Sequence, residues 1–253
     1  MTGRLEGKRA LIVGGGGGIG GAIARRFHSE GASVGIVDVD QEAAERTIAS
    51  LGDDGGVSFP LAIDIGSPEA ARDAVDTVVE KLGGLDITVH SAASRDPTAT
   101  VEDMEFEHWN EALRVNLTSM FLLCKYATPH LRAAGGGVII NIASQLGSVV
   151  TPGRAGYHAT KGAVIQLTKA IAIETAKDNI RAVTVSPGAV ETNRLLARFN
   201  TTDKMRELMV PHHPIGRLAQ PEDIAGAALF VASDDAAFMT GADLIIDGGY
   251  TAV

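Results

Sequence analysis

The sequence predicts an α/β fold in which one doubly wound, mostly parallel sheet of seven strands carries helices on both faces. Apolar runs of strand length alternate with helix-like segments along the whole chain. Such alternation is typical of βαβ units, whose strands lie parallel. The length of 253 residues suits one large domain, and no linker, repeat or low-complexity tract interrupts it. We therefore expect a single Rossmann-type domain over residues 1–253.

Strand-like and helix-like segments follow one another in order. The predicted strands are Arg9–Val13, Ser33–Val37, Val57–Ile63, Ile87–Val89, Val138–Ile142, Ala182–Val185 and Leu244–Ile246. The predicted helices are Ile19–Glu30, Glu42–Leu51, Pro68–Leu82, Trp109–Leu131, Gly156–Lys177 and Pro221–Ala232. Short apolar runs indicate the strands, and apolar residues at helical spacing indicate the helices.

One long irregular stretch, Ala189–Leu218, lies between the sixth strand and the last helix. It contains a possible short helix at Thr201–Val210. Open α/β sheets bind ligands at the carboxyl ends of their strands, where this stretch begins. Long loops in compact domains are usually lids or binding loops. We predict a substrate loop at about 189–218, with a tolerated surface insertion as the alternative.

Composition and charge narrow the class of partners. The chain is 45% apolar and has 30 glycines, which fits a folded protein rich in turns. The net charge of −9 and the lack of a Lys/Arg cluster argue against nucleic acid and anionic membranes as partners. The single cysteine, Cys124, cannot form an internal disulfide. No uncharged apolar run is long enough to span a bilayer, so we expect a cytoplasmic protein.

A glycine-rich turn joins the first predicted strand to the first helix, with the pattern Gly14-x3-Gly18-Ile19-Gly20. Glycines let a pyrophosphate approach the backbone, and the following helix N-terminus offers free N–H groups. Asp38 ends the second strand, where an acidic residue accepts hydrogen bonds from the ribose of NAD. It would repel a 2′-phosphate, and the next residue is Val39 rather than an arginine. The pattern predicts NAD in preference to NADP, unless Asp38 is only a loop residue or helix cap.

Four polar residues form a candidate catalytic group. Tyr157 and Lys161 are four residues apart at the start of a predicted helix, so the phenol and the ammonium share a face. Ser144 follows a strand end, where α/β active sites form. Asn116 is an amide within an otherwise apolar helical stretch. An ammonium about 4 Å from a phenol supplies about 4 kcal/mol at an effective dielectric constant of ~20, enough to bring its pKa toward the operating pH.

With these residues in place, the sequence resembles the short-chain dehydrogenase/reductase family over essentially its whole length. The resemblance rests on a set of motifs in family order and spacing. They are Gly14-x3-Gly18-Ile19-Gly20, Asp64 after the third strand, Asn116, Ser144, Tyr157-x3-Lys161, Ser186-Pro187-Gly188 and Ile246-Asp-Gly-Gly-Tyr250. A Tyr-x3-Lys pair alone is common by chance, whereas the full set in order is highly specific.

The resemblance implies a role for each matching position. Tyr157 is expected to be the acid/base, Ser144 to orient the substrate, Lys161 to bind the nicotinamide ribose, and Asn116 to help hold a relay water. The expected cofactor-binding residues are Gly14, Gly17, Gly18, Ile19, Asp38, Asp64, Ile65, Ser91, Ala92, Tyr157, Lys161, Pro187, Gly188, Val190 and Thr192. Asp64 and Ile65 are expected at the adenine, and the last four at the nicotinamide end.

Two departures from the family pattern affect the cofactor end. Val13 stands where the family usually has a threonine, and His90-Ser91-Ala92-Ala93 replaces the usual Asn-Asn-Ala-Gly. In the family the threonine hydroxyl helps tie these two segments together, and Val13 cannot form that bond. Our hypothesis is that His90 or Ser91 replaces part of the local hydrogen bonding. Ala93 should also narrow the floor beside the cofactor.

Other polar residues near the expected pocket are ambiguous. We expect no metal site, because His90 has no evident partner ligands and the adjacent pair His212-His213 would point in different directions. Four arginines flank the expected pocket, namely Arg95, Arg154, Arg194 and Arg198. They could bind an anionic substrate, but solvated surface arginines are the more common case.

The sequence thus predicts an NAD-dependent oxidoreductase that interconverts a secondary alcohol and a ketone. Alternatives are an NADPH-dependent 3-oxoacyl-carrier-protein reductase and a non-catalytic dinucleotide sensor or scaffold. Asp38 argues against the first, and the retained Tyr157 and Lys161 argue against the second. The resemblance implies a homo-oligomer, usually a tetramer, acting on a small-molecule alcohol or ketone. Sugars, polyols, hydroxy acids, steroids and cyclic diols all remain open as substrates.

Overall fold

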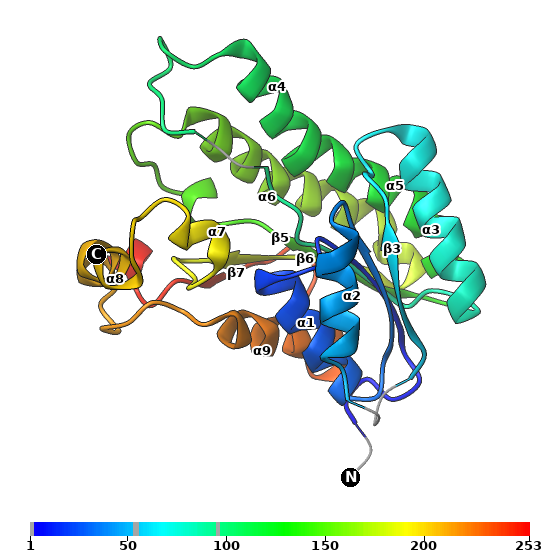
Figure 1. Ribbon diagram of the computed structural model, residues 1–253. Helices are drawn as coiled ribbons and strands as arrows, with labels where there is room; N and C mark the ends of the chain where they lie inside the picture. Colours follow the sequence, from blue (N-terminus) through cyan, green and yellow to red (C-terminus); the bar gives the residue numbers. More distant parts are fainter. Residues whose placement is uncertain (1–2, 53–55, 95–96) are drawn as a thin grey trace.

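A parallel sheet of seven strands forms the centre of the computed structural model, which describes residues 3–52, 56–94 and 97–253 (Figure 1). Its strands are β1 (Arg9–Val13), β2 (Ser33–Asp38), β3 (Ser58–Ala62), β4 (Ile87–His90), β5 (Gly137–Ile142), β6 (Ile180–Pro187) and β7 (Asp243–Ile246). They lie in the order β3-β2-β1-β4-β5-β6-β7, and every ladder between neighbours is parallel. The predicted doubly wound fold is confirmed.

Helices cover both faces of the sheet (Figure 1). Their bounds are α1 (Gly18–Ser29), α2 (Gln41–Ala49), α3 (Pro68–Leu82), α4 (Phe106–Leu113), α5 (Ser119–Ala133), α6 (Ala155–Thr175), α7 (Asn193–Leu196), α8 (Thr202–Met209) and α9 (Pro221–Ala232). Side-chain oxygens cap several of them, as where Asp40 accepts a hydrogen bond from the Ala43 backbone N at 3.0 Å. At the other end of α3, Gly83 adopts a left-handed conformation, which stops the helix.

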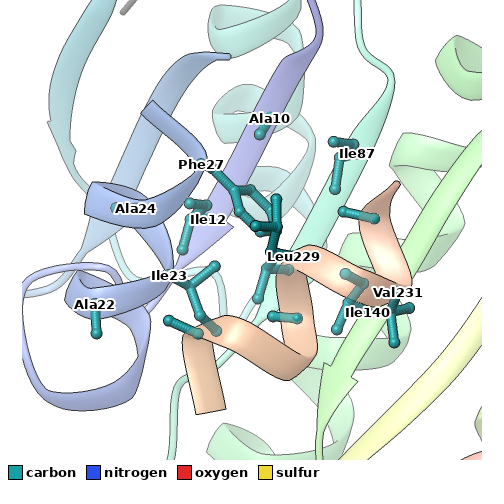
Figure 2. Packing of buried hydrophobic residues seen from close by; sticks show 14 of the residues in the cluster. Ala10, Ile12, Ala22, Ile23, Ala24, Phe27, Ile87, Ile140, Leu229 and Val231 are labelled. Carbon is teal, nitrogen blue, oxygen red and sulfur yellow. The ribbon is translucent and has the colours of Figure 1, made fainter. Parts of the chain in front are cut away.

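Successive side chains of β1 point to opposite faces of the sheet, and the hydrophobic core accordingly has two layers. Ile12 faces α1 and α9, where it packs with Phe27 and Leu229 (Figure 2). Its neighbour Leu11 points to the other face and belongs to a second cluster with Val75 of α3 and others from α5 and α6. Successive side chains of a strand point to opposite faces, so a strand buried on both sides is apolar throughout.

The long helix predicted at Trp109–Leu131 is the main difference between sequence and structure. It begins earlier, at Phe106, and is interrupted by a π-helical turn over Arg114–Thr118, after which α5 continues. A π turn spaces its backbone hydrogen bonds five residues apart and so holds an extra residue. The other predicted helix ends differ from the observed ones by at most two residues.

The stretch after β6 folds over the carboxyl end of the sheet. It contains α7 and α8, and the short helix predicted at Thr201–Val210 is present as Thr202–Met209. Ala189, Met205 and Leu218 form a small core of its own. No helix within the described residues is both long and apolar enough to cross a lipid bilayer.

Candidate active site

A crevice of about 800 Å³ opens at the carboxyl ends of the strands. It lies beside β1, where the strand order runs outward to β2 on one side and to β4 on the other. Open α/β sheets bind ligands at such a switch point. Every residue predicted from the sequence to bind the cofactor lines this crevice. Ser144, Tyr157 and Lys161 line it as well, but Asn116 lies outside its walls.

The glycine-rich turn forms the wall of the crevice between β1 and α1. A Cβ on Gly14 would lie 2.6 Å from the backbone N of Ala92, and one on Gly20 would lie 2.1 Å from the Gly14 carbonyl. Both contacts are too short for any side chain, so the close packing of turn, helix and β4 requires glycine. The position of Gly17 is different, because nothing lies within 4 Å of the place that a Cβ would take. This open backbone at the start of α1 can receive an anion.

Asp38 lies at the rim of this end of the crevice. One carboxylate oxygen accepts a hydrogen bond from the Gly16 backbone N at 2.8 Å, and the other accepts from the Asp40 backbone N at 3.1 Å. These two partners are neutral backbone groups, and Val39 beside the carboxylate is exposed. Neither hydrogen bond brings a compensating charge to the carboxylate, which lines the crevice.

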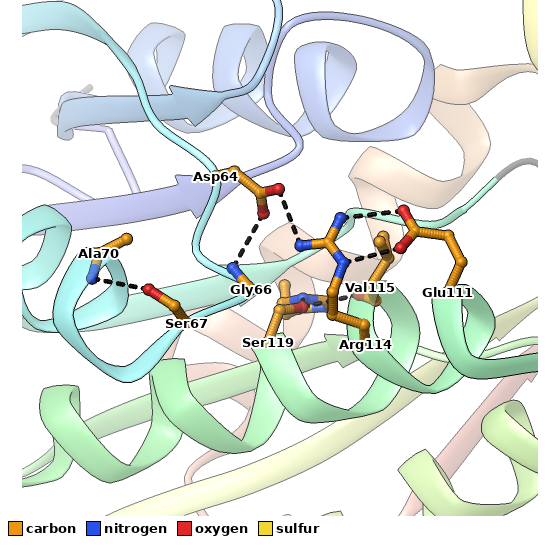
Figure 3. Close-up of polar contacts among 9 residues, drawn as sticks. Asp64, Gly66, Ser67, Ala70, Glu111, Arg114, Val115 and Ser119 are labelled. Carbon is orange, nitrogen blue, oxygen red and sulfur yellow. Dashed lines mark hydrogen bonds and ion pairs between the residues drawn. The ribbon is translucent and has the colours of Figure 1, made fainter. Parts of the chain in front are cut away.

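Asp64 is held by a bridging arginine (Figure 3). Arg114 Nη1 donates to Asp64 at 2.8 Å, while its Nε and Nη2 donate to the two oxygens of Glu111 at 2.7 and 2.9 Å. The hydrogen bonds from Arg114 lower the pKa of Glu111. Arg114 and Glu111 also line the crevice, and sequence reasoning missed both. Their spacing of three residues on a helix was the available signal.

The bonding around Val13 and His90 differs from our hypothesis. The His90 side chain does not bond to the glycine-rich turn; its Nε2 bonds to Ser119 Oγ at 2.7 Å, and that hydroxyl donates to the Val115 carbonyl. Burial lowers the pKa of His90 to about 3, so the ring is neutral. Ser91 does bond to Val13, but through main-chain atoms at 2.8 Å. The hypothesis was therefore wrong for His90, and the contact at Ser91 needs no particular side chain.

Tyr157 and Lys161 lie together on the first turns of α6, and both side chains are buried. Lys161 Nζ donates to the Ile142 carbonyl at 2.7 Å and lies 5.7 Å from the centre of the Tyr157 ring. Ser144 lies two residues after the end of β5, and its hydroxyl caps the following turn by accepting from the Leu146 N at 3.1 Å. Tyr157 and Lys161, four residues apart in the sequence, thus lie on the same face of the helix, as expected.

The environment of Tyr157 favours its phenolate form. Burial alone would raise the pKa of Tyr157, but Lys161, Arg194 and Arg154 lower it further than burial raises it, and a hydrogen bond with Ser144 adds to this. The net pKa is about 8, against an ordinary value of 10.0. A phenol with this pKa can exchange a proton at near-neutral pH.

Asn116 is fully buried in the π turn, and its side chain forms hydrogen bonds to two other segments. Its Oδ1 accepts from the Ser94 backbone N at 2.8 Å, and its Nδ2 donates to Thr160 Oγ1 at 3.1 Å. The Thr160 hydroxyl donates in turn to the Tyr157 carbonyl at 3.0 Å. The amide therefore joins the loop after β4 to the turn of α6 that carries Tyr157.

Two of the four ambiguous arginines face the tyrosine. The guanidinium carbons of Arg154 and Arg194 lie 4.4 and 5.5 Å from the centre of the Tyr157 ring. Arg198 also lines the crevice, whereas Arg95 lies outside the described residues.

The adjacent histidines have structural contacts. His213 Nε2 accepts from the Ala189 backbone N at 3.2 Å, and its Nδ1 bonds to the Met209 carbonyl at 2.9 Å. His212 packs against Tyr250, with ring centres 6.2 Å apart. Within the described part of the chain, no three His, Cys, Asp or Glu side chains form a group able to hold a metal ion.

Comparisons with known proteins give the family. Residues 14–251 match the model of a family described as enoyl-(acyl carrier protein) reductase. A short-chain type dehydrogenase/reductase from Mycobacterium marinum has a solved structure that superposes with a TM-score of 0.92, at 34% identity over 98% of this chain and 97% of that one. The chain belongs to the short-chain dehydrogenase/reductase family.

Characterised members of this family are similar over nearly their whole length. D-threitol dehydrogenase of Mycolicibacterium smegmatis is 38% identical over 98% of this chain and 94% of its own. Cyclohexanol dehydrogenase of an Acinetobacter species is 37% identical over 99% and 98%. A 7α-hydroxysteroid dehydrogenase solved with NADH and 7-oxo glycochenodeoxycholic acid has a TM-score of 0.91, at 35% identity over 97% and 95%. This short-chain dehydrogenase/reductase is an oxidoreductase that acts on CH–OH groups of small molecules, and its family binds a nicotinamide dinucleotide.

Proposed function

We propose that this protein is an NAD-dependent dehydrogenase that interconverts a secondary alcohol and its ketone, with Tyr157 as acid/base. The observation that carries the proposal is the placement of Tyr157 on the crevice, beside Ser144 and Lys161, with a pKa of about 8. The relatives that act on threitol and cyclohexanol support a small polyol or cyclic alcohol as substrate.

The crevice fits a dinucleotide, because Gly17 leaves open backbone at the N-terminus of α1 and Asp38 stands at the rim beyond it. The glycine turn would hold the pyrophosphate, Asp38 and Asp64 the adenosine end, and the residues from Pro187 to Thr192 the nicotinamide end. Bound nicotinamide supplies the acceptor or donor of hydride. Asp38 favours NAD, because the 2′-phosphate of NADP would meet a carboxylate held by backbone groups alone.

The chain's own residues then move the proton. In oxidation, the phenolate of Tyr157 takes the proton of the alcohol hydroxyl, and Ser144 orients that hydroxyl by hydrogen bonding. In reduction, the Tyr157 phenol gives its proton to the carbonyl oxygen. Lys161 holds the phenolate by charge, and its bond to the Ile142 carbonyl fixes the ammonium in place. Asn116 keeps the turn of α6 and the loop at Ser94 in register.

The remaining sequence-based predictions belong to the same proposal. Residues 1–253 form one dinucleotide-binding and catalytic domain, with residues 189–218 as its substrate loop. The homotetramer is supported by exposed apolar side chains, such as Phe121 on α5 and Ile173 on α6. The cytoplasmic location stays a prediction from the sequence.

The test is a screen of the purified protein with secondary alcohols and ketones, comparing kcat/KM for NAD(H) and NADP(H). We expect turnover with an NAD preference of about tenfold or more, since a charged hydrogen-bond acceptor contributes ~1.5–3 kcal/mol. Tyr157→Phe should lower kcat by roughly 10²–10⁴-fold and leave NADH binding unchanged. A strong NADPH preference with an acyl-thioester ketone would favour the carrier-protein reductase instead.

A further inference from the structure

His90 is a buried polar residue that the proposed mechanism does not use. It ends β4 near the centre of the sheet, where it pairs in register with Val13 of β1 on one side and Asn141 of β5 on the other. Its side chain is 2% exposed and is directed at Ser119, the first residue of α5. A strand held by ladders on both sides is a rigid element, so His90 is a fixed point of attachment for whatever it bonds to.

The π turn takes away the usual donor of one backbone carbonyl. In a regular α-helix the Ser119 N–H would bond to the carbonyl of Val115, four residues earlier. Here that N–H donates to the carbonyl of Arg114, five residues earlier. The Ser119 hydroxyl replaces the lost donor, because it donates to the Val115 carbonyl at 2.7 Å. A side chain thus supplies the hydrogen bond that the backbone of the π turn leaves out.

The direction of the bond between His90 and Ser119 follows from this arrangement. A serine hydroxyl has one proton, and here the Val115 carbonyl receives it. Toward His90 the hydroxyl can therefore only accept, so His90 Nε2 carries a hydrogen and donates it over 2.7 Å. Burial, and then the charge of Lys161, lower the pKa of His90, so the ring is neutral and has this single N–H. The order of donors runs from His90 through Ser119 to the Val115 carbonyl.

The residue that this chain of bonds holds in place is Asn116. It follows Val115 directly and precedes Ser119 by three positions, so its backbone lies within the turn that the hydroxyl closes. Its amide bonds to the Ser94 backbone N and to Thr160 Oγ1, and it thereby joins the loop after β4 to the start of α6. Both bonds depend on the direction in which the turn presents the amide.

We infer that His90 is a positioning residue for catalysis, which acts through Ser119 to hold the π turn and with it the side chain of Asn116. The inference rests on the proposed function. His90 touches no reacting atom and moves no proton; it acts on the geometry of the loop at Ser94 and of the turn that carries the catalytic tyrosine. Loss of its hydrogen bond should therefore lower kcat and leave the affinity for the cofactor nearly unchanged.

The competing explanation is that His90 only fills space in the core. Two amide variants separate the hydrogen bond from the volume. His90→Gln places an amide NH2 about where Nε2 lies and can still donate to Ser119, whereas His90→Asn is one methylene shorter and cannot reach it. Ser119→Ala removes the same bond from the helix side.

The strand itself supplies a matched control. Thr88 lies two residues before His90, so its side chain points to the same face of β4. It is fully buried, and its hydroxyl has no hydrogen-bond partner among the described residues. Thr88→Val therefore replaces a polar group in the same layer of the core without breaking a hydrogen bond.

The measurements use the full-length protein and need turnover for only one of them. We would determine kcat and KM for NAD with cyclohexanol and D-threitol as probe alcohols, and the affinity for NADH by its fluorescence. Amide hydrogen exchange, followed by mass spectrometry, would report the protection of the peptide that contains Ser94, whose backbone N–H bonds to Asn116.

The expected result is a fall in kcat of about tenfold in His90→Asn and in Ser119→Ala, the size of a lost buried hydrogen bond, with NADH affinity changed by less than about twofold. His90→Gln and Thr88→Val should keep most of kcat. The double variant His90→Asn/Ser119→Ala should be no worse than either single variant, because both remove one bond. Equal loss in His90→Gln and His90→Asn, or equal loss in Thr88→Val, would overturn the inference and leave the proposed function standing.

Hydrogen exchange separates the two claims in the other direction. If the wild type oxidises no alcohol, but His90→Asn and Ser119→Ala lose protection at Ser94 while His90→Gln keeps it, the chain of bonds stands and the proposed function fails. Unchanged protection at Ser94 in both of the first two variants would overturn the inference. Should His90→Asn not fold, Ser119→Ala carries the test, because it removes the same bond and leaves β4 intact.

Discussion

The two ends of the crevice hold their charges in opposite ways. At the β2–β3 end, Asp64 and Glu111 share Arg114, so the charges are largely balanced within the protein. At the β5–β6 end, the charged groups with the largest effect on Tyr157 are all cations. The first end is arranged to hold a ligand in place, and the second is arranged to change the acidity of one phenol.

This difference predicts how substitutions at the two ends should affect cofactor binding and catalysis. A change in a balanced network removes a hydrogen bond and is partly compensated by the remaining partners and by water. A change among the cations around Tyr157 alters the field at the reacting group directly, because a buried ring is poorly screened. Predictions for the two ends therefore differ in both size and kind.

Replacing Lys161 should have the largest effect on the cationic end. At 5.7 Å and an effective dielectric constant of ~20, its attraction for the phenolate is about 3 kcal/mol, or about 2 pKa units. In alcohol oxidation the phenolate is the active form, so Lys161→Met should move the acid limb of kcat/KM upward from about 8 and lower the rate near neutral pH by ~100-fold. Lys169→Met, exposed on the same helix, is the control. An acid limb that stays near its wild-type pH would contradict the assignment.

Replacing Asp38, which lies at the β2–β3 end but outside the Arg114 network, should change the choice of cofactor. Asp38→Asn removes the negative charge but keeps an acceptor for the Gly16 backbone N. The ratio of kcat/KM for NAD over NADP should fall by about tenfold or more, because the 2′-phosphate is no longer repelled. The control Asp73→Asn removes an equal charge from an exposed position on α3 outside the crevice, and it should leave this ratio unchanged. If Asp38→Asn also leaves it unchanged, another residue determines the cofactor.

Replacing Arg194 should have a smaller effect of the same sign as Lys161. Arg194 lies on the exposed side of the crevice, so solvent weakens its action on Tyr157. With a neutral alcohol, Arg194→Gln should raise the pH of the acid limb by about half a pKa unit to one, and the shift should shrink as salt is added. No shift at low ionic strength would show that the field at Tyr157 comes from Lys161 and Arg154 alone.

Replacing Arg114 should have the smallest effect. Arg114→Met separates Asp64 from Glu111, and KM for NAD should rise by a few-fold, on the order of 1 kcal/mol, without a change in kcat, because the site is remote from Tyr157. Arg132→Met, which breaks the pair with Asp178, is the matched control. A fall in kcat with an unchanged KM would show that the two ends are not separate.

The fold was predictable because the signals for it are local. Apolar runs of strand length located all seven strands, and the motifs at Gly14 and Tyr157 marked the same crevice from the two sides of β4. The π turn at Arg114–Thr118 was missed because it lies in a stretch so rich in apolar residues that a one-residue shift of the apolar pattern does not stand out. The predicted helix ran straight through it.

The sequence also could not predict which side chains from distant segments form hydrogen bonds or ion pairs with each other. Asp64 and Arg114 are 50 residues apart, and His90 and Ser119 are 29 apart. Which acceptor a side chain reaches depends on the direction in which each element leaves the sheet. The sequence therefore identified Asp64 as a crevice residue without its arginine. It placed His90 beside Val13, as the sheet does, but could not predict that the His90 side chain bonds to Ser119.

The π turn between α4 and α5 constrains the number of residues that this part of the chain can have. Arg114 points from it to Asp64 at one end of the crevice, and Asn116 points from it to Ser94 at the other. Each residue of an α-helix advances by about 100°, so removing one residue here would turn one of these side chains away from its partner. The segment therefore acts as a spacer. A single substitution in it weakens the contacts at one end of the crevice, whereas a one-residue deletion would disturb both cofactor binding and the geometry of the catalytic residues.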